Sequence, residues 1–522
     1  MKGRAERTLA LSRREFLLAG AALAALPGKA RPLFGGVRQN VRFANDPFQL
    51  GVASGDPIAD GVVLWTRLAP DPLHGGGMDP EPVEVRWEVA HDEQMTKVVR
   101  KGTATATPDL AHSVHVEVEG LEPDRWYFYR FRAGDEVSPV GRTRTAPRHE
   151  TISPAVRFAF ASCQHYESGL FTAYEHMAVE DLDLVIHLGD YIYESAGRDG
   201  QVRKHVGGEL HTLEDYRNRH AQYKSDAALQ ATHARFPWLV TWDDHEFDNN
   251  CAGSISEERD VDPADFLRRR ARAYQAYYEH MPLRAPATPR GPDMRLYRRI
   301  PFGRLVEFSV LDTRQYRSDQ PCGDRNKPLC DGVFDPAATL LGSEQEQWLF
   351  AGLEKSPAAW NVLAQQIMMG RVDRLPGEHV GYSMDQWAGY EVPRKRLLQL
   401  LQERRIANPV VLTGDIHSNW VNDLKLDFDD PNSPTVASEF VGTSISSSGD
   451  GSQTRNDTEG VLAENPFVRF YNAERGYVSC KVTPEAWQSD YQVVEYVTRP
   501  GAPRITRASF VVESGRPGAE RA

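Results

Sequence analysis

The sequence predicts an α/β domain preceded by a small all-β sandwich of the immunoglobulin type. Residues 48–145 alternate apolar and polar side chains in short segments separated by turn residues, which is typical of antiparallel strands. After residue 153 the pattern changes to continuous apolar runs, each followed by polar side chains and then by a helical stretch. Such runs are typical of strands that are covered on both faces in an α/β fold.

Length and composition are those of a large globular protein. The chain has 522 residues, which is too long for one ordinary core, so we expect two domains or one large decorated domain. Hydrophobic residues make up 40% and charged residues 26%, values that exclude disorder over most of the length. The formal net charge of −12 shows no excess of basic residues of the kind that binds nucleic acid, so no stable nucleic-acid partner is expected.

The amino terminus resembles a twin-arginine export signal. Arg13 and Arg14 precede an apolar segment that runs to Leu26, and small residues follow it. The apolar segment is too short to span a bilayer permanently, so we expect residues 1–30 to be removed and no transmembrane anchor to remain. This predicts use of the twin-arginine export machinery and a periplasmic or secreted, extracellular location. The alternative is an uncleaved anchor or a chance pair of arginines.

Five cysteines have to be assigned in an exported protein. Cys322 and Cys330 bracket the short loop CGDRNKPLC, and we expect a disulfide between them in an oxidising compartment. The remaining three, Cys163, Cys251 and Cys480, are an odd number, so at least one should be a free thiol or a metal ligand. Cys163 is the candidate ligand because it ends an apolar run.

Residues 44–147 are expected to form the sandwich. Val114, Val116 and Val118 share one face of a strand, with polar residues between them. Residues 121–131 resemble the late strands of a fibronectin type III domain. No residue in this part of the chain indicates a catalytic or binding role, and a linker is expected to follow it.

In residues 153–498, five apolar strands end in side chains that can bind metals or act as acids and bases. The strand-end residues are Cys163, Asp190, Asp244, Asp312 and Asp415. In α/β architectures ligands gather at the carboxyl ends of strands, so these residues are expected to meet there. The intervening helices are predicted over residues 214–234, 263–278, 343–355 and 392–404.

Three local features complete the prediction. Ser343 followed by Glu346 has the pattern of a capping box at a helix start. The Ser-rich stretch 442–451 is either a loop near the site or a flexible surface loop. Alternating strands are expected around Cys480, and residues 499–522 are expected to be a flexible tail.

The segments GDYIYE, WDDHEFDNN and GDIHSNW occur in the order of the metallophosphoesterase motifs GDxxY, GNH[DE] and GHxH. The version found here resembles the PhoD-like alkaline phosphatase and phosphodiesterase family. The resemblance implies a two-sheet metallophosphoesterase sandwich flanked by helices, preceded by a fibronectin-like domain. It also implies an exported phosphatase that hydrolyses small phosphate mono- and diesters by metal-activated hydroxide attack on phosphorus.

The resemblance also implies which residues bind metals. A first ion would be held by Cys163, Asp190, Tyr193 and His417, and thiolate, carboxylate and phenolate together favour Fe³⁺. A second, sharing Asp190, would be held by Asp244 and Asp415, oxygen donors that favour Ca²⁺. Asn249 and Asp248 could add oxygen ligands to the same ion or to another Ca²⁺. Where the wider superfamily has Asn and His in its second and third motifs, this chain has Asp244 and Asp415.

Two residues are candidates for direct action on the substrate. By resemblance, His245 would contact the phosphoryl or leaving-group oxygen as a hydrogen-bond donor or general acid, unless it is a core histidine satisfied by the backbone. Arg314 follows its own strand and could clamp two phosphate oxygens, or equally brace a carboxylate such as Asp312.

Two alternative functions follow from the same residues. Within enzymes, the alternative is a phosphodiesterase of the phospholipase D type. Outside enzymes, it is a metal-stabilised protein that binds glycans or the cell wall without turnover, which would explain the sandwich equally well. A monomer is expected in each case.

Overall fold

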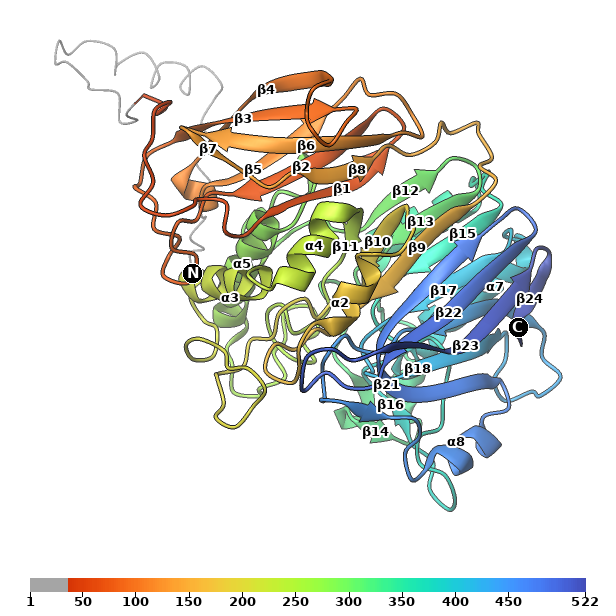
Figure 1. The fold of residues 1–522 in the computed structure, drawn as a ribbon. Helices are drawn as coiled ribbons and strands as arrows, with labels where there is room; N and C mark the ends of the chain where they lie inside the picture. The colour runs from red at the N-terminus through yellow and green to blue at the C-terminus, as the bar shows by residue number, and fades with distance from the viewer. Residues whose placement is uncertain (1–35) are drawn as a thin grey trace, which may run out of the picture.

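The computed structural model of the chain describes residues 36–522 (Figure 1). The expected export signal, residues 1–30, lies outside the described residues. Over residues 36–522, no helix has both the length and the apolar character that crossing a membrane requires.

Two large sheets form the centre of the molecule, and the long strand β21 belongs to both. Its first residues pair with β18, and its later residues pair with β9 and β22. In sheet 1 the strands follow the order β5 (Ser113–Val118), β2 (Gly61–Arg67), β1 (Val52–Ile58), β11 (Pro237–Val240), β10 (Leu184–His187), β9 (Val156–Ala161), β21 (Val468–Val482), β22 (Ala486–Val494), β23 (Arg504–Glu513) and β24 (Arg516–Arg521). In sheet 2 they follow the order β12 (Arg298–Phe302), β13 (Val306–Val310), β15 (Trp360–Ala364), β17 (Pro409–Thr413), β19 (Thr435–Val441), β18 (Asn419–Lys425) and β21.

The inner faces of the two sheets form a dry core. Phe158 of β9 meets Phe308 of β13 edge to face, with ring centroids 5.3 Å apart. Trp360 of β15 lies 5.8 Å from Trp487 of β22, measured between ring centroids. All four side chains are buried, and aromatic contacts of this kind hold the two sheets in a fixed relation.

Helices cover both outer faces, as expected for an α/β sandwich. Those on sheet 1 are α2 (Thr172–Met177), α3 (Leu213–Lys224), α4 (Ala227–Arg235) and α5 (Pro263–His280). Those on sheet 2 are α6 (Gly342–Leu353) and α7 (Glu391–Glu403), while α8 (Thr458–Glu464) lies beside β21 (Figure 1). Short 3-10 turns occur at Pro108–Leu110, Ala285–Ala287, Pro321–Gly323, Asp331–Phe334 and Trp387–Gly389. This arrangement confirms the predicted fold class.

The amino-terminal β sandwich is present, but it is continuous with the α/β domain that follows it. Its outer sheet contains β4 (Val98–Ala106), β3 (Val83–Ala90), β6 (Trp126–Ala133), β7 (Glu136–Val137) and β8 (Gly141–Arg144). Its inner strands β1, β2 and β5 extend sheet 1, because β1 pairs in parallel with β11. Trp65 also donates a hydrogen bond of 3.0 Å to the carbonyl of Glu279 in α5. The alternating valines correctly predicted the strand β5. They did not predict that this strand belongs to a sheet shared by both domains.

Two details of the predicted helices are wrong. The predicted helix over 214–234 is two helices. The first ends with Ser225 as its C-cap, and Asp226 caps the second by accepting hydrogen bonds from the N–H groups of Ala228 and Leu229. The predicted capping box at Ser343 is absent. Helix α6 already begins at Gly342, and its first turn has no side-chain cap.

The carboxyl-terminal segment is ordered, which corrects the expectation of a flexible tail at 499–522. Strands β23 and β24 form an antiparallel pair, and β23 also pairs along β22. Phe510 and Val512 are buried in the core between the sheets. Burial of these alternating apolar residues orders the segment, although its Gly, Arg and Pro residues had suggested mobility.

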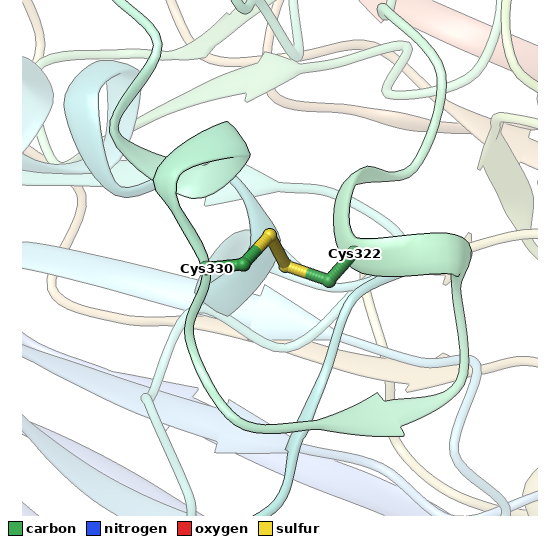
Figure 2. The surroundings of a disulfide bond; sticks show 2 residues. All are labelled: Cys322 and Cys330. Atoms are coloured by element: carbon green, nitrogen blue, oxygen red, sulfur yellow. A yellow bond between two sulfur atoms is a disulfide. The ribbon is translucent and has the colours of Figure 1, made fainter.

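The predicted disulfide joins Cys322 and Cys330 (Figure 2). The disulfide closes a small loop, and Gln320, which precedes this loop, donates a hydrogen bond of 2.8 Å to Asp385. The loop contains β14 (Asn326–Lys327), which pairs with β16 (Tyr382–Ser383) elsewhere in the chain. The other three cysteines are buried and unpaired in the described part of the chain.

Replacing both Cys322 and Cys330 with serine is expected to lower the free energy of unfolding by about 2 kcal/mol. The bond joins residues eight apart, so its removal frees a short loop of the unfolded chain. Urea unfolding of the oxidised protein and of the double variant measures the difference. A reducing agent should lower the urea concentration at which the parent unfolds and leave that of the variant unchanged. Equal urea midpoints for the oxidised parent and the variant would contradict the prediction.

Candidate metal centre

The predicted site residues lie in the loops that follow the carboxyl ends of β9, β10, β11, β13 and β17. Four of them adopt left-handed backbone conformations that non-glycine residues rarely take: Cys163 (φ 59°), Asp190 (φ 56°), Asp415 (φ 66°) and His417 (φ 53°). Gly189 also has a positive φ, and a Cβ there would meet the Cβ of Asp243 at 2.5 Å. Strained residues of this kind cluster at functional sites, where the surrounding structure holds them in place.

The four predicted ligands of the first ion are together. Donor atoms of Cys163, Asp190 and His417 all lie within 4.8 Å of one another. The Tyr193 hydroxyl donates to Asp190 Oδ2 at 2.9 Å and lies 3.3 Å from His417 Nε2. Sulfur, carboxylate, phenol and imidazole thus converge from three separate loops.

The electrostatics of this group favour a bound cation. Burial raises the pKa of Cys163, of Asp190 and of Tyr193 well above their usual values, and negative neighbours raise all three further. Burial also lowers the pKa of His417 to about 3, so its imidazole is neutral, as a metal ligand must be. Asp190 Oδ1 is buried and has no hydrogen-bond partner within residues 36–522. These donors therefore fit an ion of high positive charge.

A second group adjoins the first through Asp190. Donor atoms of Asp190, Asp244 and His245 lie within 4.8 Å of one another. Asp244 accepts hydrogen bonds from the N–H groups of His245 and Asn250, each at 2.8 Å. Asp415 accepts from Gln386 at 3.1 Å, and burial raises the pKa of Asp415 to about 6.

Arg314 connects the predicted ligands of the second group. Its guanidinium is fully buried and pairs with Asp243 and with Asp385, the latter at 2.8 Å. Its Nη2 lies 3.4 Å from Asp244 Oδ2 and 3.7 Å from Asp415 Oδ1. These contacts support the alternative that Arg314 braces carboxylates, although the side chain meets Asp243 and Asp385 rather than Asp312. Its role as a phosphate clamp stays a prediction.

His245 reaches the edge of the site and is held by a carboxylate. Its Nδ1 lies 2.8 Å from Glu194 Oε2, and its side chain is 22% exposed. Burial acts to lower the pKa of His245, but Glu194, Asp190 and Asp244 outweigh burial and raise it well above the usual value. A charged imidazolium is therefore favoured, which corresponds to a hydrogen-bond or proton donor rather than to a core histidine.

Asn249 is not directed at the second group. Its side-chain amide donates to Glu257, and its backbone N–H donates to Glu194 at 3.1 Å. The neighbouring Asp248 is engaged by Arg269 at 2.9 Å and by Ser256 at 2.6 Å. The contacts of these two side chains give no support to the prediction that they supply metal ligands.

Sequence reasoning missed two carboxylates that order the site. Glu246 accepts hydrogen bonds from the N–H groups of Asp190, Tyr191 and Asp243, at 2.7–3.1 Å, and so ties two ligand loops together. Glu194 holds His245. Both residues stand inside the quoted motifs, GDYIYE and WDDHEFDNN, so a closer inspection of acidic residues beside the ligands could have found them.

The Ser-rich stretch proves to be part of the site. Ser447 Oγ lies 2.7 Å from the Tyr193 hydroxyl and donates to the carbonyl of Cys163 at 2.7 Å. The interpretation as a loop near the site is therefore correct, and the interpretation as a flexible surface loop is wrong.

Two packed sheets, helices on both outer faces and candidate metal ligands gathered at the strand ends agree with the phosphatase class that the sequence motifs imply. The PhoD-like phosphatase family matches residues 158–491, and the N-terminal domain of PhoD-like phosphatases matches residues 35–147. The chain belongs to the PhoD-like phosphatase family.

Two relatives are similar over nearly the whole chain. Alkaline phosphatase D of Bacillus subtilis (strain 168) is 56% identical over 481 residues, which cover 91% of this chain and 82% of that protein. A solved structure described as "Structure of PhoD" superposes with a TM-score of 0.90 at 55% identity and covers 92% of this chain and 93% of its own. The family resemblance, the fold class and the expectation of a phosphoric ester hydrolase are confirmed.

Proposed function

We propose that the chain is an exported, metal-dependent phosphatase that hydrolyses small phosphate mono- and diesters. The observation that carries this proposal is the convergence of Cys163, Asp190, Tyr193 and His417 on one point, with Asp190 shared by a second acidic group. Membership of the PhoD-like phosphatase family supports the same chemistry. The relative from Bacillus subtilis carries the name alkaline phosphatase D, which supports activity toward phosphate esters.

In this proposal Fe³⁺ is held by Cys163, Asp190, Tyr193 and His417. Ca²⁺ is held by Asp190, Asp244 and Asp415, with Asn249 as a further ligand only if its side chain turns away from Glu257. When bound, such a pair of cations supplies charge for the phosphoryl oxygens and lowers the pKa of the attacking water. The ligand types support this assignment, because phenolate and thiolate favour a trivalent ion and carboxylates favour Ca²⁺.

The chain's own residues orient the ester and supply a proton. His245 is a charged donor at the edge of the site, and Glu194 fixes its ring through Nδ1, which leaves Nε2 for the leaving-group oxygen. Arg314 acts through Asp244 and Asp415 and is a positioning residue. Glu246 fixes the backbone of Asp190 and of Asp243.

Export by the twin-arginine machinery to the periplasm or the medium remains part of the proposal. The paired arginines and the apolar segment support it, and the disulfide between Cys322 and Cys330 fits an oxidising compartment. No specific contact favours a phospholipase D-type phosphodiesterase over a phosphatase. The family match and the charged His245 beside the acidic groups disfavour a protein that only binds glycans.

Removing the metals is expected to abolish hydrolysis of nitrophenyl phosphate and bis-nitrophenyl phosphate. A strong chelator is applied, metal content is measured by elemental analysis, and activity is restored by adding back Fe³⁺ and Ca²⁺ separately and together. The loaded protein should also show visible absorption from the Tyr193 phenolate and the Cys163 thiolate. Full activity without iron would contradict the Fe³⁺ assignment, and absence of turnover on both esters would contradict the enzymatic proposal.

The matched control for the visible spectrum is Tyr166→Phe. Tyr166 lies outside the proposed ligand set, and its ring stacks on the guanidinium of Arg203. This variant should keep the absorption band, whereas Tyr193→Phe should shift or lose it.

A further inference from the structure

Three buried arginines lack the carboxylate partner that a buried positive charge usually has. Arg67, Arg219 and Arg475 form no salt bridge within residues 36–522, whereas the buried Arg314 and Arg394 do. Taking a guanidinium out of water is costly unless other polar groups compensate for the lost hydration. The contacts that replace a carboxylate therefore indicate what each of these three side chains does.

Arg475 of β21 holds the loop that carries His417. Its Nη1 donates to the carbonyl of His417 at 2.8 Å and to Ser444 Oγ at 2.7 Å, and its Nη2 donates to the carbonyl of Ala473 at 2.7 Å. His417 has a left-handed backbone (φ 53°), a conformation that persists where surrounding contacts fix it. Arg475 supplies such a contact at the carbonyl of this residue.

Arg219 of α3 holds the loop that carries Tyr193 in the same way. Its Nη1 donates to the carbonyl oxygens of Tyr193 and Ser195, the latter at 3.0 Å, and its Nη2 donates to the carbonyl of Gly208 at 3.2 Å. The planar guanidinium presents its donors in a fixed fork, so one side chain can join separate segments in one geometry. Arg219 thus fixes the main chain of Tyr193 relative to α3.

Arg475 also reaches Tyr193, through two serines. Ser444 Oγ accepts from Arg475 and donates to the carbonyl of Ser447 at 2.9 Å. Ser447 Oγ lies 2.7 Å from the Tyr193 hydroxyl and donates to the carbonyl of Cys163 at 2.7 Å. The contacts of this one guanidinium therefore extend to two further proposed ligands of the first ion.

We infer that Arg219 and Arg475 are positioning residues for the first ion, because they hold the main chain of Tyr193 and His417 in the geometry that brings the phenol and the imidazole to Asp190. The inference rests on the proposed function, since it concerns the ion of that same site. A guanidinium has no lone pair to offer a cation, so neither arginine is itself a ligand. Removing a group that supports metal ligands typically lowers metal affinity by about 10- to 100-fold.

Binding of Fe³⁺ tests the two arginines without turnover. The metal-free parent, Arg475→Met and Arg219→Met are titrated with Fe³⁺ in competition with nitrilotriacetate, and the visible absorption of the bound ion reports its occupancy. Each variant is expected to bind Fe³⁺ at least about tenfold more weakly than the parent. Arg219→Met should also shift or weaken the absorption band, because it releases the main chain of the Tyr193 ligand.

Arg475→Lys and Arg219→Lys separate positioning from charge. Lysine keeps the positive charge, but its ammonium group cannot reproduce the fixed fork that joins separate segments. Each lysine variant should therefore bind Fe³⁺ about fivefold more weakly than the parent, which is the effect of losing about one net hydrogen bond. The lysine variants also carry the test if a methionine variant does not fold, and parent-like affinity in both would overturn the inference.

Arg67→Met is the matched control. Arg67 shares the burial of the other two side chains, but its contacts join β2 to α5: Nε donates to the carbonyl of Ala111 at 2.9 Å, and Nη1 lies 2.7 Å from His280 Nε2. Arg67→Met and the two methionine variants at the site should all unfold at lower urea concentration when free of metal. Only the variants at the site should lose Fe³⁺ affinity, and an equal loss in Arg67→Met would overturn the positioning role, because destabilisation alone would then explain it.

The outcomes for this inference and for the proposed function are distinct. Weaker Fe³⁺ binding by the variants at the site would support the positioning role even if the parent hydrolysed no ester, and that result would contradict only the proposed function. Parent-like Fe³⁺ binding by all of these variants, together with ester hydrolysis by the parent, would overturn only the positioning role. A parent that binds no Fe³⁺ would contradict both the iron assignment and the positioning role.

Discussion

Asp190→Asn is expected to lower kcat for phosphate ester hydrolysis by at least about 1,000-fold and to reduce the content of both metals. In the part of the chain that the structure describes, Asp190 is the side chain shared by both donor groups, and its Oδ1 has no hydrogen-bond partner there. Asparagine keeps the shape but removes the charge that would bridge two cations. Several kcal/mol of transition-state stabilisation depend on those cations, and each 1.36 kcal/mol is a factor of ten in rate.

The same variant separates a metal ligand from a structural residue. In metal-free protein, burial and the nearby carboxylates raise the pKa of Asp190, so its charged form is disfavoured there. Asp190→Asn should therefore unfold at no lower urea concentration than the parent when both are free of metal. Nitrophenol release, elemental analysis and urea unfolding give the three readouts.

Asp181→Asn is the control for Asp190. Asp181 has a side chain that is 90% exposed and lies just before β10, whereas Asp190 follows that strand. Metal content and kcat of this control should equal those of the parent. Near-normal turnover of Asp190→Asn would rule out the bridging role.

Arg314→Met is expected to lower the free energy of unfolding by about 3–5 kcal/mol. Methionine fills much of the volume but leaves Asp243 and Asp385 as buried carboxylates without their counter-ion. Removing one partner of a buried ion pair costs this much because the remaining charge stays desolvated. Urea unfolding at pH 7 measures the loss.

The loss in Arg314→Met should shrink as pH falls. Burial raises the pKa of Asp243, and Arg314 opposes that rise, so removing the arginine raises the folded-state pKa further above the unfolded value of about 3.9. A carboxyl group whose pKa is higher in the folded than in the unfolded protein contributes its full stability at pH values below its unfolded-state pKa. This contribution is lost as the pH rises through its folded-state pKa. The deficit of the variant should therefore be smaller near pH 4 than at pH 7.

Adding Asp243→Asn and Asp385→Asn to Arg314→Met should recover part of the lost stability, because the uncompensated charges are removed. Arg148→Met, at an exposed arginine, serves as the control and should change stability by less than about 0.5 kcal/mol. A loss below about 1 kcal/mol in Arg314→Met, or the same loss at both pH values, would refute the proposed bracing of the carboxylates.

Much of the site could be predicted because its ligands stand at strand ends in short motifs. Apolar runs identified β9, β10, β11, β13 and β17, and parallel strands bring their carboxyl ends to one edge. Strand ends and chain order predicted that polar residues meet at this edge, whereas the grouping of Cys163, Asp190, Tyr193 and His417 as one ligand set came from the family resemblance. The phenol of Tyr193, which alone could have been a core tyrosine, lies within reach of Asp190 and His417.

Other features depended on partners that are distant in the chain. Arg314, which follows its own strand, was expected either to clamp two phosphate oxygens with its planar guanidinium or to brace a carboxylate such as Asp312. Only the packed structure shows that Asp243 and Asp385, each 71 residues away in the sequence, enclose it.

The sequence by itself determined the sandwich, the α/β order of the catalytic part and the disulfide. These follow from periodicity, spacing and residue chemistry, which act over a few neighbouring residues. The set of candidate ligands followed from the resemblance of three short motifs to a known family. Only the tertiary structure decided that the sandwich shares sheet 1 through β1 and β11, and that residues 504–521 complete that sheet. It also decided that Asn249 faces Glu257 and that Arg314 braces carboxylates, because pairing and burial depend on which distant segments meet.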